Sequence, residues 1–204
     1  MKGIELPYEE FILKSMQDTL NNYFPYRTEG SARIKGKSKI FTHDQIHKLI
    51  NLLHPVYHDL GIEIRIQTSK FKTFIELFDM RYDSTFLNLN AIKKFNGQGA
   101  YAEIDNKLWM FEYNIHKKEN SDLRKLCALA TLFHEIRHAW QSKYKPHLFE
   151  IPYINVGEHG YKSQPIEVDA ESFSARMMTK HNKEISEILG IDFKWSYVMW
   201  NLNV

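Results

Sequence analysis

Two histidines and a glutamate in the second half of the chain have the types and the spacing of a metal centre. His134 and His138 are four residues apart, and Glu135 directly follows the first of them. On a helix, side chains at this spacing project from one face, with Cβ atoms about 6 Å apart. That separation suits two ligands of one tetrahedral zinc ion, and the Glu135 carboxylate could accept a proton from a water molecule held there. The motif predicts a catalytic zinc site, which needs a surrounding helix and a third ligand.

The third ligand is expected downstream, on a second helix that packs against the first. Glu167 is the best candidate, because it lies in the first turn of a helix that Pro165 begins. Asp169 is the rival ligand, and His159 is a further candidate. Three protein ligands leave the fourth position of the zinc ion open to water, as catalytic zinc sites require.

Other polar residues near the predicted ligands have expected supporting roles. Glu171 follows Glu167 by one helical turn, so we expect it to accept the free N–H of a ligand histidine and to fix its tautomer. Tyr161 is the favoured donor to the oxyanion that forms during hydrolysis, and His159 is the alternative. The competing interpretation is that Tyr161 only packs within the fold. For His159, the competing interpretation is that it is an exposed surface residue.

The motif and the segment after it resemble the gluzincins, a family of zinc metallopeptidases. The resemblance rests on His-Glu-Ile-Arg-His-Ala-Trp-Gln followed by Tyr161-x-x-x-Pro165-x-Glu167-x-x-Ala170, and it covers roughly residues 100 to 180. The chain is most similar to short single-domain forms found in bacilli and their phages. It departs from the thermolysin-like pattern at Glu171, which stands where an aspartate often contacts a ligand histidine.

The resemblance implies a set of ligands, a base and an activity. His134, His138 and Glu167 would bind zinc, and Glu135 would be the catalytic base. The chain would then be a zinc endopeptidase that acts on a peptide or protein substrate. The alternative is a peptidase-like zinc protein, weakly active or inactive, with a binding or regulatory role. The presence of Glu135 favours the enzyme, because a purely structural zinc site needs no base.

The elements that must position these residues can be predicted from the pattern of the sequence. A helix is expected to begin near Ser121–Asp122 and to end at Lys143–Pro146, with an apolar stripe beside the two histidines. The segment 107–115 is expected to be an edge strand that binds an extended peptide. This segment carries three aromatic residues at alternate positions: Trp109, Phe111 and Tyr113. They would contact substrate on an exposed face or pack in the core on a buried one.

The start of the chain is predicted to be helical and then basic. A helix is expected over 9–22, followed by a solvated loop over 27–39 that is rich in lysine and arginine. Such a loop is a natural site of proteolytic cleavage. An inhibitory N-terminal segment, released by cleavage there, is a further hypothesis.

A second helix is predicted to follow the basic loop. Thr42 and Gln45 have the spacing of a capping box, and the helix is expected to run to Leu60 with Gly61 as its stop. Two more pairs of histidines at the same spacing lie in this segment: His43 with His47, and His54 with His58. Neither pair has an adjacent glutamate, so we expect both to flank the apolar face of the helix.

The middle of the chain is strand-like. Five segments are strand candidates: 62–67, 71–78, 85–89, 101–104 and 107–115. The last two flank Asp105-Asn106, a polar pair suited to a hairpin turn. The expected fold is α+β and zincin-like. A small, mostly antiparallel sheet would pack on the motif helix and on a second ligand-bearing helix, with further helices at the N-terminus.

Length and composition fit a single metallopeptidase domain over 1–204, with an N-terminal helical segment over 1–60 and the sheet and active-site helices over 61–204. The net charge of +2 gives no general attraction to nucleic acid. The single cysteine, Cys127, excludes an internal disulfide. We expect no signal peptide, no membrane partner and a cytoplasmic location, because no long apolar run occurs.

Overall fold

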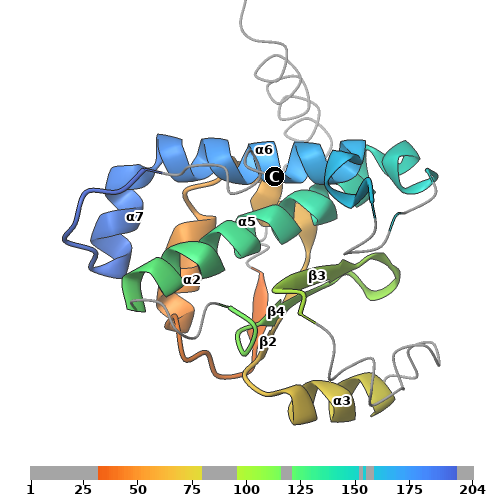
Figure 1. Ribbon diagram of the computed structural model, residues 1–204, viewed down its shortest axis with the longest axis horizontal. Coiled ribbons are helices and arrows are strands. Elements are labelled where there is room, and N and C mark those ends of the chain that lie inside the picture. Colours follow the sequence, from red (N-terminus) through yellow and green to blue (C-terminus); the bar gives the residue numbers. More distant parts are fainter. Residues whose placement is uncertain (1–31, 80–95, 116–120, 152–153, 155–158, 197–204) are drawn as a thin grey trace, which may run out of the picture.

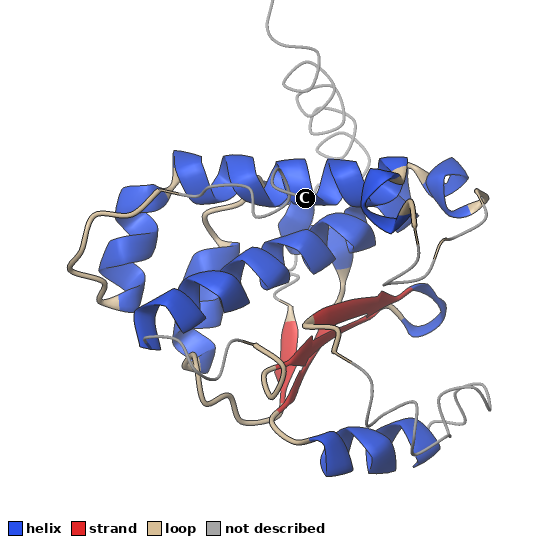
Figure 2. Cartoon of the chain, in the orientation of Figure 1, coloured by secondary structure: helices blue, strands red, loops and turns tan. Residues whose placement is uncertain are grey.

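A four-stranded sheet with helices on both of its faces forms the described part of the protein. The computed structural model describes residues 32–79, 96–115, 121–151, 154 and 159–196. Figures 1 and 2 show the sheet, whose strand order is β1-β2-β4-β3. The strands are β1 (Arg33–Lys35), β2 (Glu63–Gln67), β3 (Gly99–Ala102) and β4 (Lys107–Phe111). The predicted α+β class is confirmed.

The directions of the strands differ from the predicted, mostly antiparallel arrangement. β1 and β4 both run parallel to β2, whereas β3 pairs antiparallel with β4. The prediction was wrong because the hairpin fixes only the direction of β3 relative to β4. A helical segment joins β1 to β2, and such a crossover returns the chain to the same end of the sheet, which makes the two strands parallel.

The first strand lies in the basic stretch that the sequence predicts to be a loop. Arg33–Lys35 pairs with β2, and the Lys35 ammonium lies 2.9 Å from the Glu63 carboxylate. This part of the stretch is therefore fixed to the sheet. The helix predicted over 9–22 lies outside the described residues.

The helix predicted from Thr42 to Leu60 is divided into two. α2 (His43–Ile50) begins with the predicted capping box between Thr42 and Gln45, and a separate 3-10 segment, η1 (Pro55–Leu60), ends at Gly61, whose φ is +65°. His54 has a non-helical backbone, with ψ of 142°. A proline disfavours the helical conformation in the residue before it, so Pro55 breaks the helix.

The strand predicted over 71–78 is wrong, because this segment forms α3 (Lys70–Asp79). Ser69 begins the helix: its hydroxyl accepts a hydrogen bond from the Lys72 amide, and its carbonyl accepts one from the Thr73 amide. The first amides of a helix have no partner within the helix, and these two contacts supply partners for two of them. The strand candidate 85–89 lies outside the described residues.

The predicted hairpin around Asp105-Asn106 is confirmed, with different strand limits. A 3-10 turn, η2 (Glu103–Asp105), joins β3 to β4, and Asn106 completes it with a φ of 50°. β4 ends at Phe111, short of the predicted limit at Ile115. β4 also lies between β2 and β3, so the prediction of an edge strand over 107–115 is wrong. β3 forms the edge on this side of the described sheet.

Two long helices complete the part of the molecule that carries the motif. α5 (Ser121–Tyr144) lies between the sheet and α6 (Pro165–Lys180), while α3 lies on the opposite side of the sheet (Figure 1). The shorter elements are η3 (Pro146–Phe149), η4 (Tyr161–Ser163) and α7 (Asn182–Leu189). The predicted start and end of α5 and the start of α6 are confirmed.

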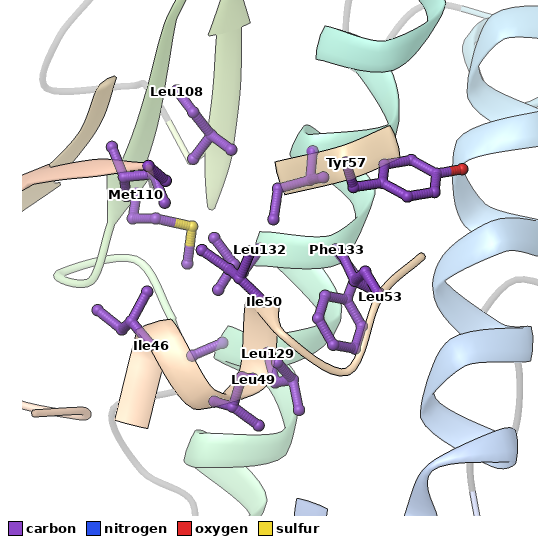
Figure 3. Packing of buried hydrophobic residues seen from close by; sticks show 14 of the residues in the cluster. Ile46, Leu49, Ile50, Leu53, Tyr57, Leu108, Met110, Leu129, Leu132 and Phe133 are labelled. Carbon is purple, nitrogen blue, oxygen red and sulfur yellow. The ribbon is translucent and has the colours of Figure 1, made fainter. Parts of the chain in front are cut away.

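The main core fills the space between α2, the sheet and α5. Figure 3 shows side chains from α2, β4 and α5 meeting there, among them Ile46, Met110 and Leu132. Each of these three side chains is at least nine-tenths buried. Burial of side chains of this size contributes about 1.5–3 kcal/mol each. The core therefore holds α5 firmly on one face of the sheet.

A separate aromatic cluster lies on the other face of the sheet. Trp109, Phe111 and Tyr113 are buried there together, and the Arg65 guanidinium lies over the Trp109 ring, 5.4 Å from its centroid. The Lys70 ammonium of α3 lies over Tyr113. These aromatic residues pack within the fold and face away from α5. In the described part of the chain, no helix has both the length and the apolar character to cross a membrane.

Candidate metal centre

The two helices that carry the predicted ligands approach each other closely. Ala170 of α6 is fully buried, and the Ser174 hydroxyl donates a hydrogen bond of 2.9 Å to the Ala130 carbonyl of α5. Pro165 is the first residue of α6, where the missing amide hydrogen removes no helical hydrogen bond. Glu167 therefore lies in the first turn of α6 and faces the motif helix.

Three side chains bring their donor atoms together between α5 and α6. The Nε2 atoms of His134 and His138 lie 2.9 Å apart; Oε2 of Glu167 lies 3.2 Å from the first, and its Oε1 lies 3.6 Å from the second. Zinc bonds of about 2.0–2.1 Å in a tetrahedral arrangement separate neighbouring ligand atoms by about 3.3 Å. With one donor atom taken from each residue, all three lie within 4.8 Å of one another, so small movements of the side chains would reach this separation. The group could hold a metal ion.

The charges of the three side chains complement one another. Burial opposes the charged form of His134, but contacts with Glu167 and Glu171 outweigh it and raise the pKa of His134 to about 10. Burial likewise opposes ionisation of Glu167, yet the two histidines hold the pKa of this carboxyl well below its usual range. Glu167 is therefore a carboxylate throughout the neutral range, which is the form that binds a cation.

Glu135 is buried beside the donor group and against the edge strand. Its pKa is raised, because burial disfavours the carboxylate more than the nearby histidines favour it. A Cβ atom added to Gly99 would lie 2.7 Å from both Cγ and Oε1 of Glu135, which is closer than real side chains approach. Glycine at this position of β3 therefore makes room for the Glu135 side chain.

Each histidine of the motif has a partner at its second ring nitrogen. Nδ1 of His134 lies 3.6 Å from the Glu171 carboxylate, on the side where the sequence predicts this contact. Nδ1 of His138 lies 2.7 Å from Oε1 of Gln141. Partners of this kind orient a ligand ring and select its tautomer.

The rival ligand Asp169 is engaged elsewhere. Its carboxylate accepts two hydrogen bonds from the Arg137 guanidinium, at 2.8 and 3.0 Å, and one of 2.7 Å from the Gln141 amide. It is absent from the group of donor atoms, which among the described residues consists of His134, His138 and Glu167. A paired guanidinium holds a carboxylate in place more firmly than water does.

The two candidates for the oxyanion donor differ in position. The Tyr161 hydroxyl donates a hydrogen bond of 3.1 Å to Oε2 of Glu167, so it lies beside the donor group. His159 has an exposed side chain and is not part of the donor group. Tyr161 therefore lies at the site. His159 lies on the surface, as its competing interpretation predicts.

The other histidine pairs have structural contacts. His43 donates through Nε2 to the Gly36 carbonyl at 2.8 Å, and His58 donates to the Ile50 carbonyl at 3.1 Å. His54 accepts a hydrogen bond from the Val56 amide through Nδ1. No donor group within the described residues includes them.

Sequence reasoning missed Gln141 and Gly99. Gln141 follows His138 by three residues on the same helix, a spacing at which side chains are neighbours, so helical periodicity could have found it. Gly99 lies outside the predicted strand 101–104, although it is the first residue of β3. A glycine within a strand often marks a close approach of another group, and this signal could have indicated the contact with Glu135.

The class defined by fold and site is an α+β protein with a His-His-Glu donor group shared between two packed helices. Comparison with models of protein families, with curated proteins and with solved structures found no match.

Proposed function

We propose that this protein is a zinc-dependent metallopeptidase. The observation that carries the proposal is the convergence of His134, His138 and Glu167 on one point, with the buried carboxylate of Glu135 next to it. Two imidazoles and one carboxylate are a donor set of catalytic zinc sites. A structural zinc site is usually closed by four protein ligands, whereas this group has three among the described residues.

The side chains around the donor group suit hydrolysis of a peptide bond. Bound zinc supplies a Lewis acid that polarises a carbonyl and activates water. Glu135 accepts a proton from the attacking water and returns it to the leaving amine. In the metal-free protein, burial raises the pKa of this carboxyl. The Tyr161 hydroxyl, held at Glu167, is the proposed donor to the developing oxyanion.

The edge strand β3 is the proposed binding strand for an extended substrate, in place of the predicted segment 107–115. β3 has a free edge in the described sheet, and Gly99 lies directly against Glu135. A peptide that adds to this edge through main-chain hydrogen bonds would pass beside the base. This mode suits a peptide or protein substrate of varied sequence.

The similarity to gluzincins and to a zincin-like fold belongs to the same proposal. It is supported by the histidine pair on α5, by the carboxylate on α6 and by the close packing of these two helices. The α+β class with helices on both faces of a small sheet is compatible with it.

Replacement of the base tests the proposal. Glu135→Gln should retain zinc, measured by metal analysis, and should lose cleavage of casein and of a broad peptide library by at least about 100-fold. The control is Glu187→Gln, a matched change at an exposed position of α7. If the wild-type protein binds zinc but cleaves neither substrate, a binding or regulatory role replaces the enzyme. If it binds no zinc, the whole proposal fails.

A further inference from the structure

Gln141 connects the two ligand-bearing helices at the centre of the site. Its side chain is completely buried. Its amide nitrogen donates to the Ile166 carbonyl at 2.9 Å and to the Asp169 carboxylate at 2.7 Å, both on α6. Its amide oxygen lies 2.7 Å from Nδ1 of His138 on α5. Every hydrogen-bonding atom of this side chain therefore has a partner.

These contacts allow only one orientation of the Gln141 amide. The Ile166 carbonyl and the Asp169 carboxylate can only accept hydrogen bonds, so the NH₂ group must face them. The amide oxygen then faces His138, and an oxygen of this kind can only accept. The proton of the neutral His138 ring must therefore be on Nδ1. This leaves the lone pair on Nε2, the atom that faces His134 and Glu167.

A second layer of contacts holds the partner of Gln141 in place. Asp169 is bound by the Arg137 guanidinium through two hydrogen bonds. Arg137 also donates to the Tyr57 hydroxyl, and its guanidinium lies 3.9 Å from the centroid of the Trp140 ring. Figure 3 shows the Tyr57 hydroxyl directed away from the apolar cluster and toward α6. The amide of Gln141 is thus fixed by residues that are not part of the donor group.

We propose that Gln141 is a positioning residue for the metal centre: it holds His138 in the tautomer that binds metal and ties this ligand to α6, next to Glu167. The inference rests on the proposed metal site and extends it. A neutral imidazole free in water prefers the proton on Nε2, which is the atom that must bind the metal. Gln141 reverses that preference before the metal arrives, and this preorganisation strengthens binding.

The first test needs no variant. Nitrogen-15 NMR of the histidine rings in metal-stripped wild-type protein at pH 8 reports which nitrogen of His138 carries the proton. The expected result is protonated Nδ1 and unprotonated Nε2. A proton on Nε2 overturns the proposal, whatever the protein does to peptides.

The second test compares two changes at position 141 with a matched control. Gln141→Met keeps the volume and removes the acceptor, so the zinc Kd, measured against a competing chelator, should rise about 10- to 100-fold. Gln141→Glu keeps an acceptor for His138 but loses the donor to α6, so it should lower stability and yet bind zinc at least about tenfold tighter than Gln141→Met. Ser174→Ala removes another hydrogen bond between α5 and α6, one that contacts no donor side chain, and should leave the zinc Kd unchanged.

The outcomes separate this inference from the proposed function. Wild-type protein that binds no zinc contradicts the proposed function itself. Wild-type affinity in Gln141→Met, or equal weakening in all three variants, overturns the positioning role while the metal site stands. Equal weakening would mean that Gln141 acts only through the packing of α5 on α6.

Discussion

At the proposed site, a proton and a metal ion would compete for the same atom of His134. Contacts with Glu167 and Glu171 favour the charged imidazole and raise its pKa from 6.5 to about 10. A metal ligand must be the neutral imidazole, so metal binding at neutral pH would release this proton. The favourable contacts of the imidazolium stabilise the metal-free fold fully below pH 6.5. That contribution is lost as the pH rises toward 10.

Zinc affinity should therefore increase with pH. Release of one proton from His134 predicts about a tenfold gain in affinity per pH unit from about pH 7 to pH 9. Chelator-competition titrations at several pH values measure the slope. In Glu171→Gln, which lacks one of the carboxylates that favour the charged ring, the slope should flatten at a lower pH. Affinity that is independent of pH in the wild-type protein contradicts the assignment.

The close contact between Gly99 and Glu135 predicts the effect of a substitution at position 99. In Gly99→Ala the new methyl group would overlap Cγ and Oε1 of Glu135, so the carboxylate must move. Peptide cleavage should fall by at least about tenfold, since small displacements of catalytic groups are costly. Zinc content should not change. Gly190→Ala is the control for lost stability. Its backbone has a positive φ, which an alanine adopts only at a cost in stability, and the added Cβ would have no atom within 4 Å.

At the scale of elements, the site depends on how α5 and α6 are held together. Arg137 is 4% exposed and bridges the helices by its paired hydrogen bonds to Asp169. Its guanidinium also lies over the rings of Trp140 and Phe173. Breaking a buried pair leaves a charge without its partner, which costs more than an exposed pair contributes. The same interaction fixes the acceptor that orients Gln141.

Arg137→Ala should accordingly destabilise the fold by about 3 kcal/mol, measured by urea unfolding of the metal-free protein. Lys48→Ala is the control, because Lys48 pairs with Asp44 on the exposed side of α2. Its expected cost is within about 0.5 kcal/mol. Equal stability of the two variants would show that the buried pair contributes no more than a surface pair does.

At the scale of the whole molecule, the donor group lies between two layers of the fold. The main core packs α5 on one face of the sheet, while the aromatic cluster and α3 lie on the other face. α5 lies between α6 and the sheet (Figure 1). A metal ion bound by residues of both helices would therefore link α6 to the rest of the fold.

Removal of the metal should lower thermal stability. A ligand at 1,000 times its Kd stabilises the folded state by about 4 kcal/mol, which corresponds to roughly 10 °C in Tm for a chain of this size. Calorimetry of the zinc-loaded and chelator-treated protein measures the difference. Glu167→Gln, which weakens one ligand, should show a much smaller difference. Identical Tm values for both wild-type samples would exclude a metal ion held by α5 and α6.

The sequence by itself determined the local features of this protein. The motif on α5, the start of α6 at Pro165, the capping box at Thr42 and the hairpin at Asp105-Asn106 could all be predicted. Each depends on residues within a few positions of one another, where helical periodicity and turn preferences act directly. The position of Glu167 in the first turn of the helix that Pro165 begins also pointed to it as a candidate ligand.

Only the tertiary structure decided which segments lie side by side. The parallel pairing of β1 and β4 with β2, the edge position of β3 and the helical form of α3 were not predicted. Tertiary structure also determined that Glu167, and not Asp169, lies beside the two histidines, because the Asp169 carboxylate accepts hydrogen bonds from Arg137 and Gln141. Such choices depend on packing between distant segments, and the local pattern of residues carries little information about it.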